Sequence, residues 1–335
     1  MKTLVTGATG FLGGALTRRL HSMGWDVTAL GRNPAKLNEL EDDGIRAVRA
    51  DISKKDEVTA SFSGRELVFH CAAFPSPWGD FEKFYQANVI GTRNVAQACL
   101  ENNVKRLVYV STPSIYFDYS SRTGVKENDP LPEPISHYAR TKLLAEEEID
   151  KGFANGLAVI SIRPRALFGE GDTVIFPRLL ARIKTGRLPI LGEGENMVDL
   201  TYIQNVVDAL LLCADSPVNT TGKKYNVSNG EPVKIWSLVN RICDELGFPH
   251  PRRKISRKAA HLVGGSFEFL YSLIPHSPEP PLTRMSVSMM ANTTTLDISA
   301  AQNELGYQPR VSVEEGVERF LKWWKEKNPS LRGGR

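Results

Sequence analysis

A tyrosine and a lysine four residues apart, Tyr138 and Lys142, are the side chains of this sequence best suited to acid–base chemistry. They fall within 136–154, a range that predicts a helix with Ser136 as its N-cap, so both side chains share one helix face. A tyrosine hydroxyl has an ordinary pKa of about 10, and bringing it near 7 takes roughly 4 kcal/mol of preferential stabilisation of the phenolate. A lysine charge one turn away supplies part of that stabilisation. The pair therefore predicts proton exchange with a carbonyl oxygen.

A hydroxyl side chain that orients the same oxygen is expected upstream of this pair. The apolar run 104–111 predicts a strand, and several hydroxyl side chains stand at its carboxyl end, among them Ser111, Thr112 and Ser114. A hydroxyl there can donate a hydrogen bond to a substrate oxygen. Because Tyr-x-x-x-Lys spacing is common by chance, an exposed helix face is the alternative. A catalytic site is favoured by the order of these residues along the chain, because Thr112 comes first and Tyr138 follows it 26 residues later.

Three glycines at three-residue spacing stand between a short apolar strand and a helical pattern near the N-terminus. Such a turn can hold a diphosphate, because glycines allow a tight turn and close approach while the helix N-terminus offers free N–H groups and a positive dipole. The spacing departs from the usual G-x-G-x-x-G, so an ordinary turn is the alternative. The residues expected to contact the diphosphate are Gly7, Thr9, Gly10, Phe11, Leu12 and Gly13.

Strands alternate with helices along the first half of the chain, which predicts right-handed crossovers and a doubly wound parallel α/β sheet. We expect a Rossmann domain over 1–163, to which 203–228 returns. A smaller α/β substrate-binding lobe is expected over 164–202 and 229–330. Residues 331–335 are expected to be a disordered tail. The expected strands after the first are 27–30, 45–50, 66–70, 104–111, 157–163 and 224–227.

A diphosphate-binding turn beside an acid–base tyrosine indicates a nicotinamide dinucleotide, and the residue after the second strand decides which one is preferred. A carboxylate there would bind the ribose hydroxyls and favour NAD, whereas this chain has Arg32, whose guanidinium suits a 2′-phosphate. We therefore expect NADP(H) in preference to NAD(H), with an exposed arginine as the alternative. Asp51 is expected to accept a hydrogen bond from the adenine or to cap the next helix. The other expected cofactor contacts are Ile52, Ala72, Ala73 and Pro164, together with Tyr138 and Lys142.

Composition adds a few limits. The 335 residues include 42 Lys and Arg against 38 Asp and Glu, and a net charge of +4 is too slight to argue for nucleic acid. Four cysteines without a C-x-x-C pair and six histidines without ligand spacing predict buried thiols in a reducing compartment and no metal site. No apolar stretch reaches the roughly 20 residues of a membrane span. Because Met1 leads directly into the first strand, we expect no signal peptide and a cytoplasmic protein.

The chain resembles the extended short-chain dehydrogenase/reductases over nearly its whole length. The resemblance implies that Tyr138 is the acid/base, that Lys142 is its partner and that Thr112 is the active-site hydroxyl, with Ser111 as the second choice. It also places Asn88 at the family's helix asparagine, where a supporting role is expected. The matching stretches are Thr-Gly-Ala-Thr-Gly-Phe-Leu-Gly at 6–13, Asn-Val-Ile-Gly-Thr-Arg-Asn at 88–94, Ser-Thr-Pro-Ser-Ile-Tyr at 111–116, Tyr-Ala-Arg-Thr-Lys at 138–142 and Arg-Pro-Arg at 163–165.

One stretch favours a particular branch of these enzymes. Members that act on nucleotide sugars place an arginine for the sugar diphosphate where this chain has Val198, and an unpaired buried diphosphate would be costly. Residues 198–205, Val-Asp-Leu-Thr-Tyr-Ile-Gln-Asn, instead resemble the 3β-hydroxysteroid dehydrogenase branch, which includes sterol-4-carboxylate 3-dehydrogenases and bacterial 2-alkyl-3-oxoalkanoate reductases. The resemblance therefore implies an oxidoreductase that interconverts a secondary alcohol and a ketone (a 3-hydroxy/3-keto group) on a hydrophobic substrate such as a sterol or a long-chain 3-oxo acid.

Two alternatives stay open at this point. The first is a nucleotide-sugar epimerase or dehydratase in which other arginines replace the missing one. The second is a non-catalytic NADP sensor, although such proteins typically lose the tyrosine that this chain keeps. The arginines that could bind a sugar diphosphate are Arg165, Arg178 and Arg284.

Two kinds of partner are expected besides the cofactor. Basic residues at 252–258 precede an apolar run at 262–274 that is too short to span a bilayer. This segment is either a helical lid or a lid that also lines a lipid pocket or makes a peripheral membrane contact through 252–274, and both interpretations put an apolar wall over the cleft. The resemblance further implies a homodimer through the helices expected at 81–102 and 136–154.

Overall fold

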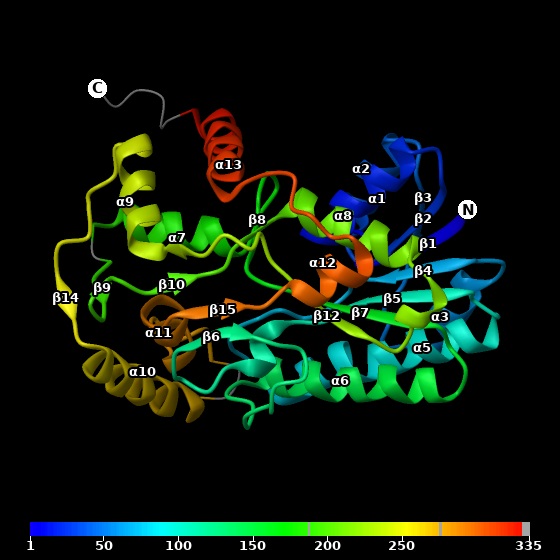
Figure 1. Cartoon of the computed structure of the whole chain (residues 1–335), viewed down its shortest axis with the longest axis horizontal. Helices are drawn as coiled ribbons and strands as arrows, with labels where there is room; N and C mark the ends of the chain where they lie inside the picture. The colour runs from blue at the N-terminus through cyan, green and yellow to red at the C-terminus, as the bar shows by residue number, and fades with distance from the viewer. Residues whose placement is uncertain (187, 275–276, 330–335) are drawn as a thin grey trace.

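The structure, a computed structural model, describes residues 1–186, 188–274 and 277–329, so the expected tail at 331–335 lies outside the described residues. Its centre is a seven-stranded sheet in the order β12-β7-β5-β4-β1-β2-β3, with every neighbouring pair parallel (Figure 1). The predicted doubly wound parallel α/β fold is confirmed. The strands of this sheet are β1 (Lys2–Thr6), β2 (Asp26–Gly31), β3 (Arg46–Arg49), β4 (Leu67–His70), β5 (Arg106–Val110), β7 (Val159–Pro164) and β12 (Lys224–Val227).

Helices cover both faces of this sheet, and the apolar strand residues divide between them. Successive side chains of a strand point to opposite faces. In β1, Leu4 enters the core that includes Val95 and Ile149, whereas Val5 enters the core that includes Leu16. A strand buried on both faces reads as a continuous apolar run, as these strands do. One face carries α1 (Phe11–Ser22), α2 (Pro34–Asp42) and α8 (Ile203–Asp215), and the other carries α3 (Lys55–Thr59), α4 (Phe81–Phe84), α5 (Gly91–Glu101) and α6 (His137–Ala154).

The helices that border the site begin at recognisable caps. Asn33 accepts a hydrogen bond from the Lys36 backbone N–H at 3.2 Å and precedes Pro34 at the first position of α2. Ser136 caps α6 by accepting from the Ala139 backbone N–H at 3.1 Å, as the sequence predicted. Between α4 and α5 the chain forms a π-helical stretch, Tyr85–Ile90, of the kind that often marks functional positions.

A second, smaller α/β part packs against the carboxyl edge of the main sheet, on the left of Figure 1. It contains a four-stranded sheet in the order β13-β10-β15-β6 and two short two-stranded pairs, β11 with β8 and β14 with β9. The strands are β6 (Arg122–Val125), β8 (Leu167–Phe168), β9 (Ile190–Leu191), β10 (Met197–Val198), β11 (Thr201–Tyr202), β13 (Val233–Lys234), β14 (Lys254–Ile255) and β15 (Thr294–Leu296). The helices are α7 (Ile175–Lys184), α9 (Ile235–Leu246), α10 (Arg257–Ser272), α11 (Arg284–Ala291), α12 (Ser299–Leu305) and α13 (Val313–Lys327), and single 3₁₀ turns occur at Ala60–Phe62, Pro113–Tyr116 and Val218–Thr220.

The segment 118–135 contains a strand, β6, that the sequence did not indicate. Strand β6 pairs with β15, so a piece of the range 1–163 joins the sheet of the smaller part. Val125 is buried there, whereas its neighbour Gly124 is exposed. Strand β12 pairs with β7 in the main sheet, which places 224–227 at its edge.

No helix among the described residues is both long enough and apolar enough to cross a membrane. In the same part of the chain, no group of three or more His, Cys, Asp and Glu side chains is arranged to hold a metal ion.

Candidate active site

Tyr138 and Thr112 meet at the carboxyl edge of the main sheet. Tyr138 is partly buried in the first turn of α6, and its hydroxyl forms a hydrogen bond with the Thr112 side chain. Burial raises the pKa of Tyr138 above its ordinary value of 10, and the interaction with the Thr112 side chain opposes that rise. The direction is opposite to the lowering expected from the spacing, because burial is the largest influence on this hydroxyl.

Lys142 points into the sheet. Its Nζ donates hydrogen bonds to the Tyr109 hydroxyl at 2.6 Å and to the Val110 carbonyl at 2.8 Å, and it lies 4.3 Å from the centroid of the Tyr109 ring. Only 1% of this lysine is exposed, and its burial lowers its pKa to about 7, while the charge of Glu146 acts in the opposite direction. A lysine held in this way can be charged or neutral near neutral pH, and a nearby carboxylate favours the charged form.

Glu146, one further turn along the same face of α6, is the carboxylate in question. It accepts a bidentate pair of hydrogen bonds from Arg163, with Nε to Oε1 at 2.8 Å and Nη2 to Oε2 at 2.5 Å, and both side chains are almost fully buried. The Ser111 hydroxyl donates to Glu146 Oε1 at 2.5 Å, and Lys224 Nζ lies 3.2 Å from Oε2. Ser111 is therefore committed to this buried network, which leaves Thr112 as the better placed of the two candidate hydroxyls.

Thr112 and Asn88 have defined local partners. Thr112 Oγ1 accepts from the Ser114 backbone N–H at 3.2 Å and donates to the Ser114 hydroxyl at 3.0 Å, so it caps the short turn after β5. Asn88 lies in the π-helical stretch, where its Oδ1 accepts from the Phe74 backbone N–H at 2.7 Å and its Nδ2 donates to Thr141 Oγ1 at 3.0 Å. Asn88 thus connects the loop after β4 to α6, an arrangement that fits the expected supporting role.

The glycine turn approaches its neighbours more closely than any side chain would allow. Gly7 has a φ of +71°, and a Cβ there would lie 2.6 Å from the Ala72 backbone nitrogen. A Cβ at Gly13 would lie 2.2 Å from the Gly7 carbonyl oxygen, and the Gly10 N–H donates to that same oxygen at 2.9 Å. The third glycine is therefore required for the turn itself. The turn, including Thr9, Phe11 and Leu12, leads directly into the N-terminus of α1.

A large cleft opens beside the first turn of α6. Its volume is about 1020 Å³, and its walls come from the loop after β4, the N-terminal turn of α6, α10 and the start of α11. Tyr138 itself does not line it, but its neighbours Ser136 and His137 do. The Trp78 indole donates to Ser277 Oγ at 3.2 Å, which ties one wall to the other. The large apolar side chains of the walls are Phe74, Trp78, Phe81, Phe84, Ile135, Phe269, Tyr271, Ile274 and Met285.

Comparison with known proteins identifies the family. The model described as "NAD dependent epimerase/dehydratase family" matches residues 3–228. The 2-alkyl-3-oxoalkanoate reductase of Stenotrophomonas maltophilia is 37% identical over 326 residues, covering 96% of this chain and 98% of that protein. The chain belongs to the NAD-dependent epimerase/dehydratase family. It is an NAD-dependent enzyme of the extended short-chain dehydrogenase/reductase type, as its motifs predicted.

Two further relatives show the range of this epimerase/dehydratase family around the chain. The 3beta-hydroxysteroid-dehydrogenase/decarboxylase isoform 1 of Arabidopsis thaliana is 34% identical, covering 95% of this chain and 78% of that protein. The solved structure of MoeE5 in complex with UDP-glucose and NAD superposes with a TM-score of 0.76 at 26% identity, covering 98% of this chain and 99% of that one.

The two residues expected around the adenosine, Arg32 and Asp51, lie next to each other after strands β2 and β3. Arg32 Nη1 lies 3.5 Å from Asp51 Oδ2, and Asp51 Oδ1 accepts from the backbone N–H and hydroxyl of Ser53. Asp51 therefore closes its own turn, and Lys54, whose side chain makes no capping bond, precedes α3. Burial acts to raise the pKa of Asp51, but the Ser53 hydrogen bonds and the Arg32 charge hold it below its ordinary value.

The remaining expected cofactor residues are placed as follows. Ile52 is buried, and its backbone carbonyl accepts from Asn94 Nδ2 at 2.9 Å. Ala72 and Ala73, both partly buried, follow β4 beside the glycine turn. Pro164 is the buried last residue of β7, paired with Val227 of β12, so it lies at the same carboxyl edge.

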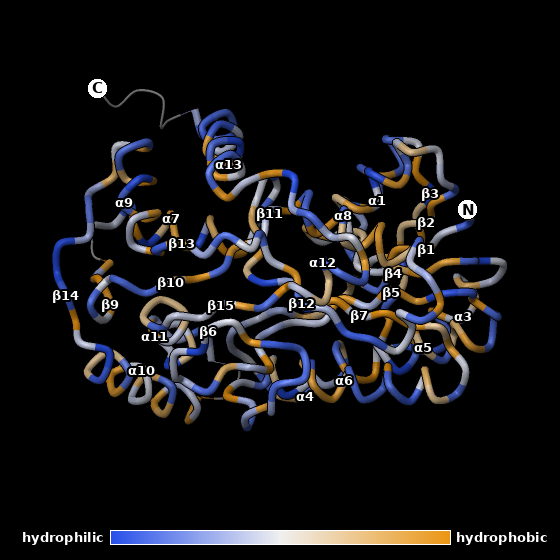
Figure 2. The backbone as a smooth tube through the Cα atoms, viewed as in Figure 1, coloured by the Kyte–Doolittle hydropathy of each residue, from blue (hydrophilic) through white to orange (hydrophobic). Residues whose placement is uncertain are grey.

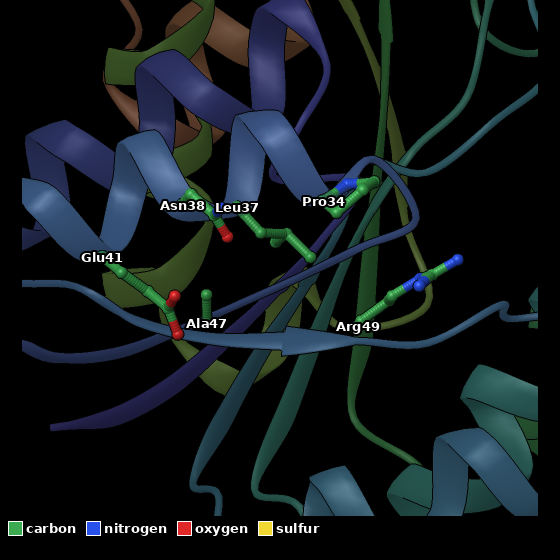
Figure 3. Close-up of a pocket in the computed structure, with 6 residues that line it drawn as sticks. All are labelled: Pro34, Leu37, Asn38, Glu41, Ala47 and Arg49. Atoms are coloured by element: carbon green, nitrogen blue, oxygen red, sulfur yellow. The ribbon is translucent and has the colours of Figure 1, made fainter.

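Two groups near the site were not found from the sequence. Arg49 ends β3 opposite Gly31 and places a second exposed cation next to Arg32. Figure 3 shows Arg49 near Pro34, at one end of a cavity of about 170 Å³ between α2 and β3, which is smaller than the roughly 300 Å³ of typical ligand pockets. The second is the Glu146 network described above.

Proposed function

We propose that this enzyme interconverts a ketone and a secondary alcohol on a hydrophobic substrate, such as a sterol or a long-chain 3-oxo acid, with Tyr138 as the acid/base. The observation that carries the proposal is the cleft of about 1020 Å³ beside the turn that holds Tyr138, because nine large apolar side chains line it along with a smaller number of charged ones. Clefts of this size bury most of the surface of a ligand with a large apolar body. The names of the reductase and steroid dehydrogenase relatives support the same substrate class.

The glycine turn fits a nicotinamide dinucleotide, because Gly7 and Gly13 let the backbone close tightly against itself just before the N-terminus of α1, whose free N–H groups can bind a diphosphate. Bound NAD(P)H supplies the hydride. Tyr138 donates its hydroxyl proton to the carbonyl oxygen during reduction and takes it back during oxidation. Thr112 turns its hydroxyl hydrogen from Ser114 toward the same oxygen and orients it.

Lys142 contributes its charge in this mechanism. A charged ammonium one helix turn from Tyr138 stabilises the phenolate that remains after proton transfer. Glu146 favours the charged form of Lys142, whose pKa of about 7 would otherwise fall further with its burial. Asn88 is a positioning residue, because it holds the loop after β4 against α6.

We expect kcat/KM to rise with the apolar length of the substrate. In a series of 3-oxo acids assayed by NADPH oxidation, each added methylene that enters the cleft contributes about 0.8 kcal/mol, or about fourfold, until the cleft is filled. Replacing Phe81 with alanine removes part of one wall and should weaken the preference for long chains while sparing short ones. Phe153→Ala, at an exposed phenylalanine in the C-terminal turn of α6, is the matched control.

A flat or falling length dependence, together with turnover of a UDP-sugar, would promote the alternative. That alternative, a nucleotide-sugar epimerase or dehydratase, is favoured by the likeness to MoeE5. Val198, at the position where nucleotide-sugar enzymes have an arginine, is buried in β10. Two of the arginines that could replace it already form ion pairs, Arg178 with Glu279 and Arg284 with Glu268. Of the three candidate arginines, Arg165 is buried with its Nε unbonded, and the charge of Asp199 acts on it. A non-catalytic NADP sensor fits less well, because Tyr138 and Lys142 are both present.

NADP(H) is proposed as the preferred cofactor. Asn33 uses its side chain to cap α2, so no carboxylate or free amide follows β2 to hold ribose hydroxyls. Arg32 and Arg49 instead bring two exposed guanidinium groups to that corner. A 2′-phosphate would find charge-assisted donors there.

Arg32→Ala should weaken NADPH binding by roughly 10–100-fold, because a lost guanidinium–phosphate hydrogen bond costs about 1.5–3 kcal/mol, and should leave NADH binding nearly unchanged. The measurement is a fluorescence titration of both cofactors. Arg46→Ala, at the opposite end of β3, is the control and should behave as wild type. If the wild type prefers NADH, or if Arg32→Ala leaves the NADPH affinity unchanged, Arg32 does not bind the 2′-phosphate.

Two further features belong to the same proposal. A homodimer through the helices of 81–102 and 136–154 is supported by the partial exposure of Leu100, Leu143 and Leu144, although Ala96 and Ile149 are buried within the protomer. A cytoplasmic location is supported by the four cysteines, which are all free thiols.

A further inference from the structure

Large apolar side chains cluster on the outer face of one segment. The structure exposes thirteen large hydrophobic residues in its described part, and six of them fall within 262–274. Leu262 is 73% exposed, Leu270 55% and Leu273 65%, and their spacing puts them on one face of α10 and its C-terminal extension. We call this set the α10 apolar face. Its members are Leu262, Val263, Phe269, Leu270, Leu273 and Ile274.

The α10 apolar face lies at the outer edge of the molecule. Figure 1 shows α10 at the far end from β1, β2 and β3, and Figure 2 shows hydrophobic residues along this helix. The opposite face of α10 packs inward through buried Ala260 and Gly264, against α11. A contiguous exposed apolar patch of this kind marks an interaction surface, whereas scattered single residues do not.

Basic residues predominate next to this face, although the charge of Lys254 also acts on Glu195. Five exposed basic residues, which we call the basic cluster, precede or begin α10, and none forms an ion pair with a described carboxylate. The one acidic residue of 252–274, Glu268, is turned inward and accepts from the Arg284 backbone N–H at 2.7 Å and from its Nε at 2.6 Å. The basic cluster consists of Arg252, Arg253, Lys254, Arg257 and Lys258.

We propose that residues 252–274 dock the enzyme onto the surface of an anionic lipid bilayer. The α10 apolar face would enter the boundary between headgroups and acyl chains, and the basic cluster would contact the negative headgroups. A second copy of this chain is a poorer occupant, because it presents the same five positive charges and no exposed carboxylate in this segment. An anionic bilayer offers acyl chains to the α10 apolar face and negative headgroups to the basic cluster.

The docking surface continues into the cleft. Phe269 and Ile274 belong to the α10 apolar face and also line the cleft, together with Tyr271 and Ser272 between them. Where the substrate is hydrophobic, which rests on the proposed function, it can pass from the bilayer into the cleft without crossing water. The continuity of the docking surface with the cleft explains why α10 has apolar side chains both toward the cleft and toward the outside.

The test is co-sedimentation of the full chain with vesicles of phosphatidylcholine alone and of phosphatidylcholine with added phosphatidylglycerol. Wild type should bind the anionic vesicles and dissociate as salt is raised. The double variant Leu270→Glu/Leu273→Glu, whose residues do not line the cleft, should bind at least about tenfold more weakly. Arg252→Ser/Arg253→Ser should weaken binding to anionic vesicles by about fivefold per charge. Val218→Glu, at a residue that is 78% exposed elsewhere, is the control and should bind as wild type.

Three results would overturn the proposal: no binding of wild type to anionic vesicles at low salt, unchanged binding by the Leu270/Leu273 variant, or self-association that this variant abolishes without any vesicle binding. Turnover of a short, water-soluble ketone should be the same in all these variants. Wild type that binds vesicles but turns over no ketone would contradict the proposed function and leave the docking surface standing.

Discussion

Tyr138→Phe is expected to lower turnover by about 10²–10⁴-fold, the range that a positioned general acid or base contributes. The substitution removes one hydroxyl, keeps the ring that fills the first turn of α6, and breaks the hydrogen bond with Thr112. Because burial raises the pKa of this tyrosine, the neutral hydroxyl is the form present at neutral pH, ready to donate a proton during reduction. The measurement is steady-state NADPH oxidation with the best ketone of the chain-length series.

The control for this variant separates chemistry from folding. Dinucleotide affinity, measured by titration, should change little, because the diphosphate contacts come from the glycine turn. Tyr307→Phe also removes a single hydroxyl, one that donates to the Ser228 carbonyl at 3.0 Å, and should retain near-normal turnover. Near-normal turnover in Tyr138→Phe, or equal loss in both variants, would remove Tyr138 from the acid/base role.

The sequence was sufficient for the fold because the signals that specify it are local. Leu4 and Val5 lie in a short apolar strand, and the glycines that follow it lead into a helical pattern, so the first crossover is readable within fourteen residues. Strand β6 gave no such signal. It is four residues long and is stabilised by pairing with β15, which lies about 170 residues further along the chain. Arg49 was missed for a similar reason, since its place beside Arg32 depends on the pairing of β2 with β3.

In the candidate site, too, some residues could be found from the sequence and others could not. Tyr138, Lys142 and Thr112 stand out by type and spacing, and their catalytic roles stay predictions. Glu146 did not stand out, because three successive glutamates read as a solvated helix face. The structure exposes Glu147 and buries Glu146, which lies four residues after Lys142 and eight after Tyr138. That four-residue repeat on one helix face was the available signal.

Glu146→Ala is expected to reduce the free energy of unfolding by about 3–5 kcal/mol at neutral pH, because it leaves the buried guanidinium of Arg163 without its carboxylate. The measurement is urea unfolding at equilibrium. Glu147→Ala, one residue further along the same helix and exposed, should change stability by less than about 0.5 kcal/mol. The double replacement Glu146→Met/Arg163→Met should recover much of the loss, since an apolar pair of similar volume often replaces a buried ion pair at little cost.

The pH dependence of the stability lost in Glu146→Ala identifies the cause of that loss. Burial acts to raise the pKa of Glu146, but the hydrogen bonds and charge of Arg163, with Lys224 and Ser111, hold it below its ordinary value of 4.5. A carboxyl whose pKa is lower in the folded than in the unfolded protein adds stability above the unfolded value and loses it as the pH falls through the folded one. The difference between wild type and Glu146→Ala should therefore be full near pH 7 and shrink below about pH 4.5. A small difference at pH 7 would show that the ion pair adds little to stability. A large difference that does not change with acid would show that the lost packing of the side chain outweighs the ion pair.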